Sequence, residues 1–446
     1  MSARRIAIAV ASATAVSLAL AGCSSSKSTG ASSTPSAAAS TSASSAPTSV
    51  ATSAVPASAP ASVAASSPAS GGGLALTVED YYTWSTGQVL DKVYKACAAS
   101  IGDTITSTHT PGAGLIAKVL QQASSKTLPD VLMLDNPDVQ EIAQSGALAP
   151  LTDYGITADG FTPGVVSAGT YSGKLYGLAP AVNSLGLYYN TDMFKAAGIT
   201  SPPATWADFK ADAAKLTKPG VYGFAMAGIG TYEGTWDFMP WMWSNGGDEK
   251  DISTPQTAQA LQFLVDLVKD GSMSKSVVTW GQDDAISQFT AGKAAMVEGG
   301  SWNVSAFQAM KNFHWASVPL PTQTASQTPV APLGGETYNV TETGNKDKMA
   351  AAAKIVACIS SPANQQLLAT TEGAIPSSVS LAAGVAQSNP ALASFVTVVS
   401  KARSRTAELG PDWPTAATKI YTAEQSALTG KLSPTAALAQ AQSQSQ

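Results

Sequence analysis

A sharp change of composition near Gly73 limits which part of this 446-residue chain can fold. From Ser24 to Gly73 the chain consists almost wholly of Ser, Ala, Thr, Pro and Gly, with Lys27 as its only charged residue and no aromatic residue. Such a segment cannot bury enough apolar surface to offset the entropy that it would lose on ordering. We therefore expect residues 23–73 to form a disordered tether with a reach of roughly 40 Å, and the fold to lie in residues 74–446.

The first 22 residues have the pattern of an export signal. Two arginines precede an apolar run from Ile6 to Ala21, which is too short to span a membrane comfortably and ends in small residues. The phrase Leu20-Ala21-Gly22-Cys23 resembles a bacterial lipobox, which implies cleavage before Cys23 and lipidation of that cysteine. The alternative is a plain secretory signal. The pattern predicts a lipid-anchored protein on the outer face of a bacterial cell membrane.

Charge and cysteine content narrow the classes of function. The chain has 25 basic and 30 acidic side chains and no evident basic patch, which argues against a nucleic-acid partner. No later apolar run approaches the roughly 20 residues of a membrane-spanning helix. Besides Cys23 only Cys97 and Cys358 are present. In an oxidising compartment these two form one disulfide or remain as two buried thiols, and no metal-type cysteine spacing occurs.

Strands and helices alternate at the start of the foldable part. The segments with strand character are Leu74–Trp84, Asp103–Ser107 and Pro129–Asp135. Helical patterns separate them, and this order predicts an α/β fold with a parallel sheet. Ligands of such sheets gather beyond the carboxyl ends of the strands. The polar and aromatic residues on that rim, and hence candidate ligand contacts, are Trp84, Ser85, Asp135 and Asn136. Helix capping is an alternative role for the last two.

The stretch from Lys174 to Ile199 has the character of a boundary between two lobes. Its centre, Leu185 to Tyr189, is apolar and aromatic and suits a buried strand, and Asn190 then begins a short helix. We expect the chain to leave one lobe here and to enter another. Asn183 and Ser184 then serve as hinge residues or as ligand contacts.

Aromatic residues concentrate farther along the chain. Three of the nine tryptophans, Trp236, Trp241 and Trp243, fall within eight residues of each other. They form either the buried face of a core helix or a platform on which sugar rings stack, because pyranose rings have apolar faces and polar edges. Trp280 lies in a predicted loop before the next helix and is a further candidate contact.

Several phrases of the sequence resemble one protein family. They are Pro129-Asp130-Val131, Gln144–Leu151, Leu187–Phe194 with Ala197-Gly198-Ile199, Gly292–Trp302 and Val318–Pro321. Together they resemble the extracellular solute-binding proteins of ABC importers, and most closely the sugar-binding group that includes maltose- and glycerol-phosphate-binding proteins. The resemblance covers nearly all of the foldable part.

The resemblance implies a two-lobe α/β architecture of the periplasmic-binding-protein type II, with a hinge and an interlobe cleft. It assigns residues 74–182 and about 322–378 to lobe 1, and residues 183–321 and about 379–446 to lobe 2. It further implies ligand contacts at Glu298, Gly299 and Trp302, where a strand ends at the cleft, with lobe packing as the alternative for Trp302. Gly335 and Glu336 are expected near the cleft. Arg405 occupies the region where many relatives carry an arginine that faces the ligand, although Arg405-Thr406 stands where Arg-Pro is common.

No catalytic set is evident in the sequence. His109 and His314 are the only histidines, and no serine or cysteine motif is placed to use them. Asp135 and Glu298 could flank a sugar as glycosidase carboxylates do, but the same acids can accept hydrogen bonds from hydroxyl groups in a binding protein.

We predict a monomeric binding protein without enzymatic activity, cofactor or metal. It captures a mono- or oligosaccharide and delivers it to ABC permease subunits in the membrane. The alternatives are a non-sugar solute such as a polyamine, phosphate ester or peptide, a secreted carbohydrate-active enzyme, and an adhesive lipoprotein.

Overall fold

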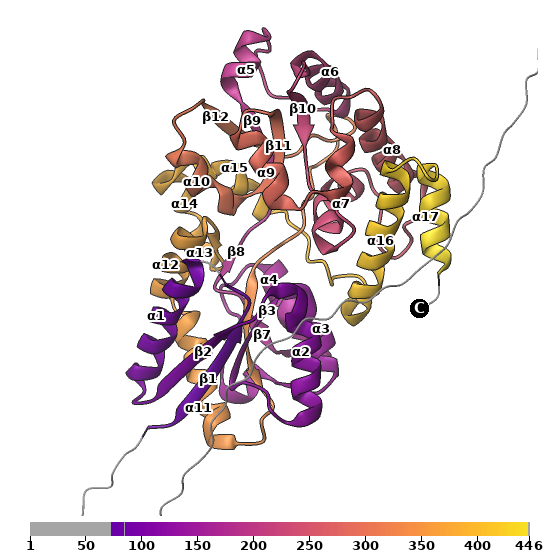
Figure 1. Cartoon of the computed structure of the whole chain (residues 1–446). Coiled ribbons are helices and arrows are strands. Elements are labelled where there is room, and N and C mark those ends of the chain that lie inside the picture. The colour runs from indigo at the N-terminus through magenta and orange to yellow at the C-terminus, as the bar shows by residue number, and fades with distance from the viewer. Residues whose placement is uncertain (1–72, 84, 445–446) are drawn as a thin grey trace, which may run out of the picture. The chain divides into compact units, whose positions relative to one another are not determined.

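The computed structural model describes residues 73–83 and 85–444 (Figure 1). The predicted signal peptide, the lipidation site Cys23, the tether and Trp84 lie outside the described residues, as does the side chain of Ser85. Within the described ranges, no helix combines the length and the apolar character needed to cross a membrane.

Six strands form the first sheet, in the order β2-β1-β3-β13-β4 with β7 also paired to β13. They are β1 (Ala75–Asp80), β2 (Thr104–His109), β3 (Val131–Asp135), β4 (Leu148–Ala149), β7 (Gly177–Leu178) and β13 (Glu336–Thr341). The strands β1, β2 and β3 are parallel, whereas β13 runs antiparallel to β3. The first predicted strand was drawn too long: β1 ends at Asp80, because the Asp80 carboxylate accepts a hydrogen bond from the Tyr82 amide at 2.9 Å and turns the chain.

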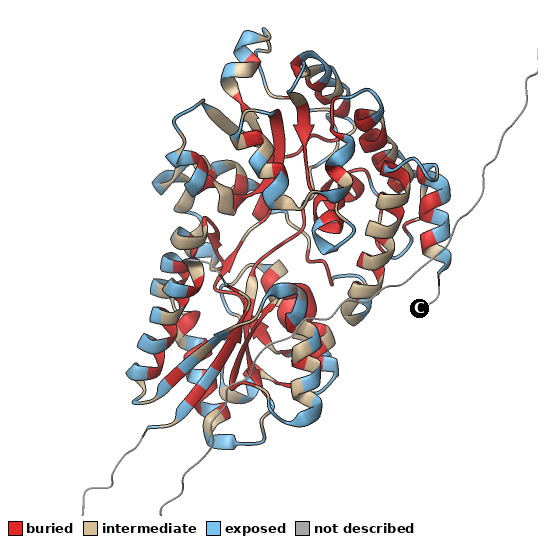
Figure 2. Ribbon diagram, viewed as in Figure 1, coloured by how far each residue is buried: buried red, intermediate tan, exposed pale blue. Residues whose placement is uncertain are grey.

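Helices cover both faces of this sheet. On one face Val131 and Met133 of β3 pack in a core shared with α1 (Ser85–Ser100), α11 (Lys346–Ile359) and α12 (Pro362–Glu372). On the other face Leu132 and Leu134 pack against α2 (Gly112–Ser125) and α3 (Val139–Gln144). Figure 2 shows the inner strands of both sheets largely buried, the edge strand β2 partly exposed, and the outer faces of the helices exposed. The predicted sheet with helices on both faces is confirmed, with β13 as an antiparallel addition that also pairs with β4.

The second sheet has four strands in the order β10-β11-β9-β12. They are β9 (Leu185–Asn190), β10 (Tyr222–Ala225), β11 (Ala294–Gly300) and β12 (Trp315–Val318). One face packs against α6 (Trp206–Leu216), α7 (Tyr232–Ser244), α8 (Pro255–Lys269), α16 (Trp413–Leu428) and α17 (Pro434–Ser443). The other packs against α9 (Gln282–Thr290), α10 (Val304–Ala309) and α15 (Ala393–Val399). The structure therefore has two lobes, each built on one sheet.

Shorter elements connect these parts. They are α4 (Pro163–Gly169), α5 (Thr191–Ala196), α13 (Val379–Ala382), α14 (Val385–Ser388), β5 (Thr170–Tyr171), β6 (Lys174–Leu175), η1 (Asn136–Asp138), η2 (Leu151–Tyr154), η3 (Lys275–Thr279), η4 (Ser301–Asn303), η5 (Pro390–Leu392) and η6 (Gly410–Asp412). Two helix starts follow from the sequence. The Asn190 side chain caps α5 by accepting from the Met193 amide, and Thr205 caps α6 by accepting from the Asp208 amide.

The chain crosses between the lobes close to Asn183. Before it, β8 (Ala181–Val182) pairs antiparallel with β14 (Ile375–Pro376), and Asn183 itself forms a bridge with Gly334. Ser184 is fully buried and donates a 2.7 Å hydrogen bond to the Pro332 carbonyl. Of the two roles expected for Ser184, its place in the crossing fits that of a hinge residue, and its burial leaves no surface for a ligand. The residue bounds assigned to the two lobes stay a prediction.

A disulfide joins Cys97 on α1 to Cys358 on α11, with the two Cα atoms 5.8 Å apart. Of the two states left open by the sequence, the structure has the bonded one. Because α1 precedes the second sheet in the chain and α11 follows it, the disulfide links the two halves of the discontinuous first lobe.

Candidate functional site

The first part of the candidate site lies at the carboxyl end of β3. Asp135, the last residue of β3, is paired in register with Glu336, the first residue of β13. The Tyr81 hydroxyl donates a 2.5 Å hydrogen bond to Glu336 Oε1. Burial, and after it the charge of Asp135, raises the pKa of Glu336 despite this bond. Two carboxyl groups therefore lie side by side on this rim of the first sheet.

A third carboxyl group extends this row toward α12. Glu372, the last residue of α12, is partly buried. Desolvation, and after it the charge of Glu336, raises its pKa well above the ordinary value, while a hydrogen bond with Tyr82 opposes the shift. We call Asp135, Glu336 and Glu372 the carboxyl row. It can accept several hydrogen bonds from a ligand that carries hydroxyl groups.

Arg405 joins the second lobe to this row. It lies between α15 and α16, and its guanidinium donates to Asp135 Oδ1 at 2.5 Å and to Asn136 Oδ1 at 3.4 Å. The same guanidinium stacks 4.5 Å from the ring centroid of Trp236 on α7. The charged hydrogen bond to Asp135 thus crosses from one lobe to the other, while the cation–π contact holds Arg405 against the second lobe.

Asn136 supports the rim. Its side-chain amide donates to the carbonyls of Leu333 and Gly335 at 3.0 and 3.2 Å. Asp135 precedes η1 without a side-chain capping bond. The side chains of Asp135 and Asn136 therefore do not cap a helix, which was the alternative role considered from the sequence. Gly335 has a φ of +134°, and a Cβ there would stand 2.6 Å from the Ala181 carbonyl, which explains a glycine at this crossing.

The ring of Trp236 is largely covered, so it fits the core helix better than the open stacking platform, the two roles considered from the sequence. Its side chain is 8% exposed, Arg405 covers one face of its ring, and its ring edge packs against Gly334. Its indole nitrogen has no hydrogen-bond partner among the described residues. A sugar could reach this ring only after Arg405 moved.

Trp302 lies where β11 ends and brings the second lobe close to α12. Its ring folds over Gly300, where a Cβ would stand 2.1 Å from ring atoms. Gly373, directly after Glu372, approaches the same turn, since a Cβ on Gly373 would stand 2.8 Å from the Ser301 carbonyl oxygen and 3.1 Å from Trp302 Cα. The side chain of Trp302 remains partly exposed.

Trp241 and Glu298 are core residues, which corrects their prediction as ligand contacts. Trp241 is 0% exposed, packs against Phe209, Phe224 and Phe263, and donates a 2.8 Å hydrogen bond to Glu298 Oε2. Glu298 is 2% exposed. Both residues therefore bind each other inside the second lobe, and no ligand surface is left on either.

The neighbours of these two residues are also largely enclosed. Gly299 is buried, and a Cβ there would stand 2.8 Å from the Ile286 side chain. Trp280 is partly buried against both cores of the second lobe, and its carbonyl accepts from the amides of Gly228 and Ile229 at 3.2 Å each.

The structure thus brings Asp135, Asn136, Trp236, Trp302, Gly335, Glu336 and Arg405 to one region beside the crossing at Asn183. The residues that sequence reasoning missed there are Tyr81, Tyr82, Asp138, Glu372 and Gly373. The tyrosines directly follow the first strand, so the rule that placed Trp84 on the rim could have found them. No sequence pattern marks Glu372, which reaches the rim only through the packing of α12.

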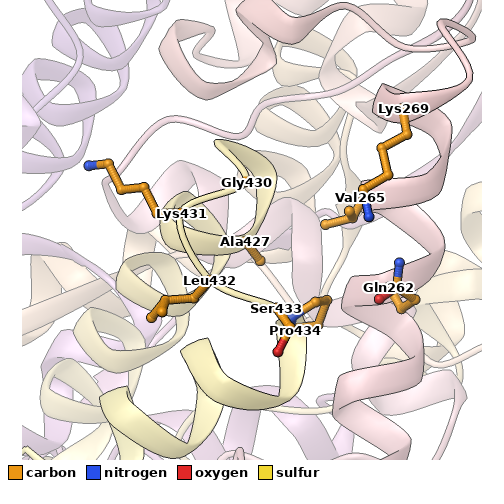
Figure 3. A pocket seen from close by; sticks show the side chains of 9 residues that line it. All are labelled: Gln262, Val265, Lys269, Ala427, Gly430, Lys431, Leu432, Ser433 and Pro434. Carbon is orange, nitrogen blue, oxygen red and sulfur yellow. The ribbon is translucent and has the colours of Figure 1, made fainter. Parts of the chain in front are cut away.

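The best-defined cavities lie elsewhere. One of about 240 Å³ lies between α8 and the turn from α16 to α17 (Figure 3). Another of about 380 Å³ borders α5. Neither contains a residue of the candidate site. In the part of the chain that the structure describes, no cluster of three or more His, Cys, Asp or Glu residues could hold a metal ion.

The contact between Gly373 and the Ser301–Trp302 turn gives a first prediction. Gly373→Ala should force this turn away from α12, because the new Cβ meets backbone atoms. The matched control is Gly344→Ala, since Gly344 has a φ of +76° and an added Cβ there meets nothing within 4 Å. Both variants should lose about 1 kcal/mol to backbone strain. Only Gly373→Ala should change the radius of gyration in solution scattering; identical profiles for the two variants would contradict the contact.

The sequence of this chain is similar to those of several known proteins. The profile of the bacterial extracellular solute-binding proteins matches residues 92–394. A binding protein of Brucella abortus is 30% identical over 237 residues, which cover 51% of this chain and 57% of that protein, so the chain spans little more than half the length of this curated relative. The galactooligosaccharide-binding protein of Bacillus subtilis is 24% identical over 351 residues, 74% of this chain and 79% of the other.

Solved structures agree with the two-lobe fold. The cyclic alpha-maltosyl-1,6-maltose binding protein from Arthrobacter globiformis superposes with a TM-score of 0.71 at 26% identity, over 83% of this chain and 97% of that chain. Maltose-bound T. maritima MalE3 superposes with a TM-score of 0.74 at 23% identity, over 83% and 98% of the two chains. The second likeness concerns the fold alone.

Proposed function

Since this chain belongs to the bacterial extracellular solute-binding proteins, we propose that it binds a carbohydrate between its two lobes and delivers it to the permease of an ABC importer. The proposal includes lipid anchoring through Cys23 on the outer face of the cell membrane, with the low-complexity segment as a tether. Relatives named for oligosaccharide binding support a carbohydrate as the ligand.

The observation that carries the proposal is the carboxyl row between tyrosine and tryptophan side chains. Asp135 and Glu336 offer acceptors for vicinal hydroxyl groups, Tyr81 lies beside Glu336, and the backbone of the partly exposed Trp302 approaches Gly373, the residue after Glu372. Sugar rings need this combination, because their edges hydrogen-bond and their faces are apolar. A phosphate ester fits less well, since the cation at this site, Arg405, is already paired with Asp135.

Ligand binding is proposed to shift the angle between the lobes. The crossing near Asn183 consists of short paired segments, β8 with β14 and Asn183 with Gly334, and the bend is proposed to occur there. A ligand that contacts both lobes favours the closed arrangement. Arg405 is central to this step, because its guanidinium already bridges Asp135 and Trp236. A sugar that enters must displace or share that contact.

The test is a titration of the protein with a panel of neutral mono- and oligosaccharides, followed by calorimetry and thermal shift. Saturating binding by at least one sugar, with compaction in solution scattering, is expected. Binding of a polyamine, peptide or phosphate ester in place of all sugars would overturn the carbohydrate proposal. New reducing ends without stable binding would indicate a hydrolase instead.

A further inference from the structure

The candidate site holds more acidic than basic side chains. Among the described residues one basic side chain pairs with its acids, Arg405, whose guanidinium lies 2.5 Å from Asp135 Oδ1. The further acids are Glu336 at the start of β13, Glu372 at the end of α12 and Asp138 in η1. A ligand that brings a positive charge would reduce this imbalance, because opposite charges attract more strongly at a partly buried site than in water.

The imbalance is sharpest at Glu336. Glu336 and Asp135 stand directly opposite each other on the antiparallel strands β13 and β3. Side chains of such a pair lie on one face of the sheet with their Cβ atoms about 5 Å apart, and like charges there repel each other. Arg405 pairs with Asp135, whereas Glu336 accepts a 2.5 Å hydrogen bond from the neutral hydroxyl of Tyr81. A cation is therefore still missing beside Glu336.

Both carboxyl groups can be reached from outside. The side chain of Asp135 is 33% exposed, and Glu336 is partly exposed. The acids in the core of the second lobe differ in this respect, since Glu298 and Glu424 are enclosed. The pair on the rim of the first sheet is thus open to a solute.

Two buried donors beside this pair call for oxygen acceptors. Trp236 is 8% exposed and Arg405 5%, and neither Trp236 Nε1 nor Arg405 Nε has a hydrogen-bond partner among the described residues. The guanidinium lies 4.5 Å from the centroid of the Trp236 ring and reaches Asp135 from there. Burying an N–H group without an acceptor costs free energy. A polyamine offers no oxygen acceptor and a neutral sugar brings no charge, whereas a sugar with a free amino group has both.

We propose that the carbohydrate ligand is an amino sugar, whose protonated amino group binds Glu336 next to Asp135. The inference rests on the proposed function and narrows it to a cationic class of sugar; neutral sugars bind the same site more weakly. An ammonium group has three donors and can bridge carboxylates of the two strands. The oxygen atoms of the same sugar can accept from Trp236 and Arg405.

Proton release distinguishes an ammonium contact from a hydroxyl contact. Burial, and after it the charge of Asp135, raises the pKa of Glu336, although Tyr81 and Tyr82 donate to it; Glu372 adds a further acid nearby. The empty site therefore keeps a proton on Glu336 to higher pH than a free glutamate does. An ammonium group favours the ionised carboxylate and expels this proton, so the affinity for an amino sugar should rise between about pH 5 and pH 7.

The test compares sugars that differ at one substituent, by calorimetry with the full chain. The pairs are glucosamine with glucose, galactosamine with galactose, and β-1,4-linked diglucosamine with cellobiose. In whichever pair binds, the amino sugar should bind about tenfold more tightly at about pH 6.5, because its hydrogen bond to Glu336 is charge-assisted. The released proton is measured by repeating the titration in phosphate and HEPES buffers, whose ionisation enthalpies differ.

Glu336→Gln keeps the shape of the side chain and removes its charge. In this variant the ratio of the two affinities within a pair should fall toward one, and the proton release should disappear. The matched control is Glu342→Gln, an exposed acid just beyond the other end of β13, which should keep the ratio and the proton release of the wild type. Circular dichroism shows whether each variant is folded.

The outcomes separate this inference from the proposed function. Equal affinities within every pair that binds, or binding of neutral sugars alone, would overturn the amino sugar and leave carbohydrate binding intact. A preference for the amino sugar that survives in Glu336→Gln would overturn the assignment of the amino group to Glu336. Failure of the wild type to bind any sugar, neutral or amino, would remove both proposals.

Discussion

The Cys97→Ser/Cys358→Ser double variant is expected to unfold its first lobe before its second. The disulfide closes a loop of 261 residues that contains the whole second sheet, and both of its cysteines belong to helices of the first lobe. Loss of a loop constraint of this size costs about 2–5 kcal/mol, because the unfolded chain gains conformational freedom. Neither cysteine of the disulfide belongs to the second lobe, so the stability of that lobe should change little.

The tryptophans make this separation measurable. Eight of the nine lie between residues 206 and 413, in segments of the second lobe and its flanking helices. Tryptophan emission therefore reports on the second lobe, whereas far-ultraviolet circular dichroism reports on both. In the double variant the dichroism should begin to change at lower urea than the emission does.

Chemical reduction supplies the control for this experiment. Dithiothreitol should produce the same split in the wild type and have no effect on the double variant. If dichroism and tryptophan emission of the double variant both changed at the urea midpoint of the wild type, the disulfide would not stabilise the first lobe.

Local patterns in the sequence were sufficient for much of the fold. The apolar and aromatic run at Leu185–Tyr189 forms β9, and the caps at Asn190 and Thr205 act as their residue types suggest. These features depend on neighbours within a few positions, which a single sequence displays directly. The two-lobe arrangement followed from the family phrases and agrees with the solved structures.

The candidate site could be predicted only in part, because its residues meet over long separations. Arg405 and Asp135 are 270 positions apart, and nothing in their local sequence shows that they pair. The aromatic cluster at Trp236–Trp243 indicated an important helix but not which ring faces which way. As a result, Trp241 was predicted as a ligand contact although it lies in the core.

Glu298 was likewise predicted as a ligand contact, and its burial leads to the second large effect. Three carboxyl groups lie close together in the core of the second lobe: Asp237, Glu298 and Glu424, all at most 2% exposed. Asp237 accepts from the Ala227 amide and from Gln282, but neither oxygen of Glu424 has a hydrogen-bond partner among the described residues. Burial raises the pKa of all three, of Asp237 to about 8, and the charge of Asp237 adds to the shift of the other two.

The sign of the effect follows from proton binding. An unfolded carboxyl group loses its proton near pH 4, whereas these folded groups keep theirs to higher pH. Between about pH 4 and pH 8 the native state therefore binds more protons than the unfolded state, and stability falls as the pH rises through this window. Across this window the free energy of unfolding should be highest near pH 4 and several kcal/mol lower at pH 8, since each pKa unit is worth about 1.4 kcal/mol.

Glu424→Gln isolates this contribution. The amide cannot ionise, so the variant should match the wild type near pH 4 and be more stable at pH 8 by on the order of 2 kcal/mol. Urea unfolding at a series of pH values measures the difference, with Glu342→Gln, an exposed acid of the first lobe, as the control for a simple change of net charge. Parallel curves for Glu424→Gln and wild type would mean that Glu424 is ionised to the same extent in the folded and unfolded states. In that case water or an unrecognised partner must solvate a carboxylate that the structure shows as enclosed, because an unpaired charge in such a core would otherwise cost the protein several kcal/mol.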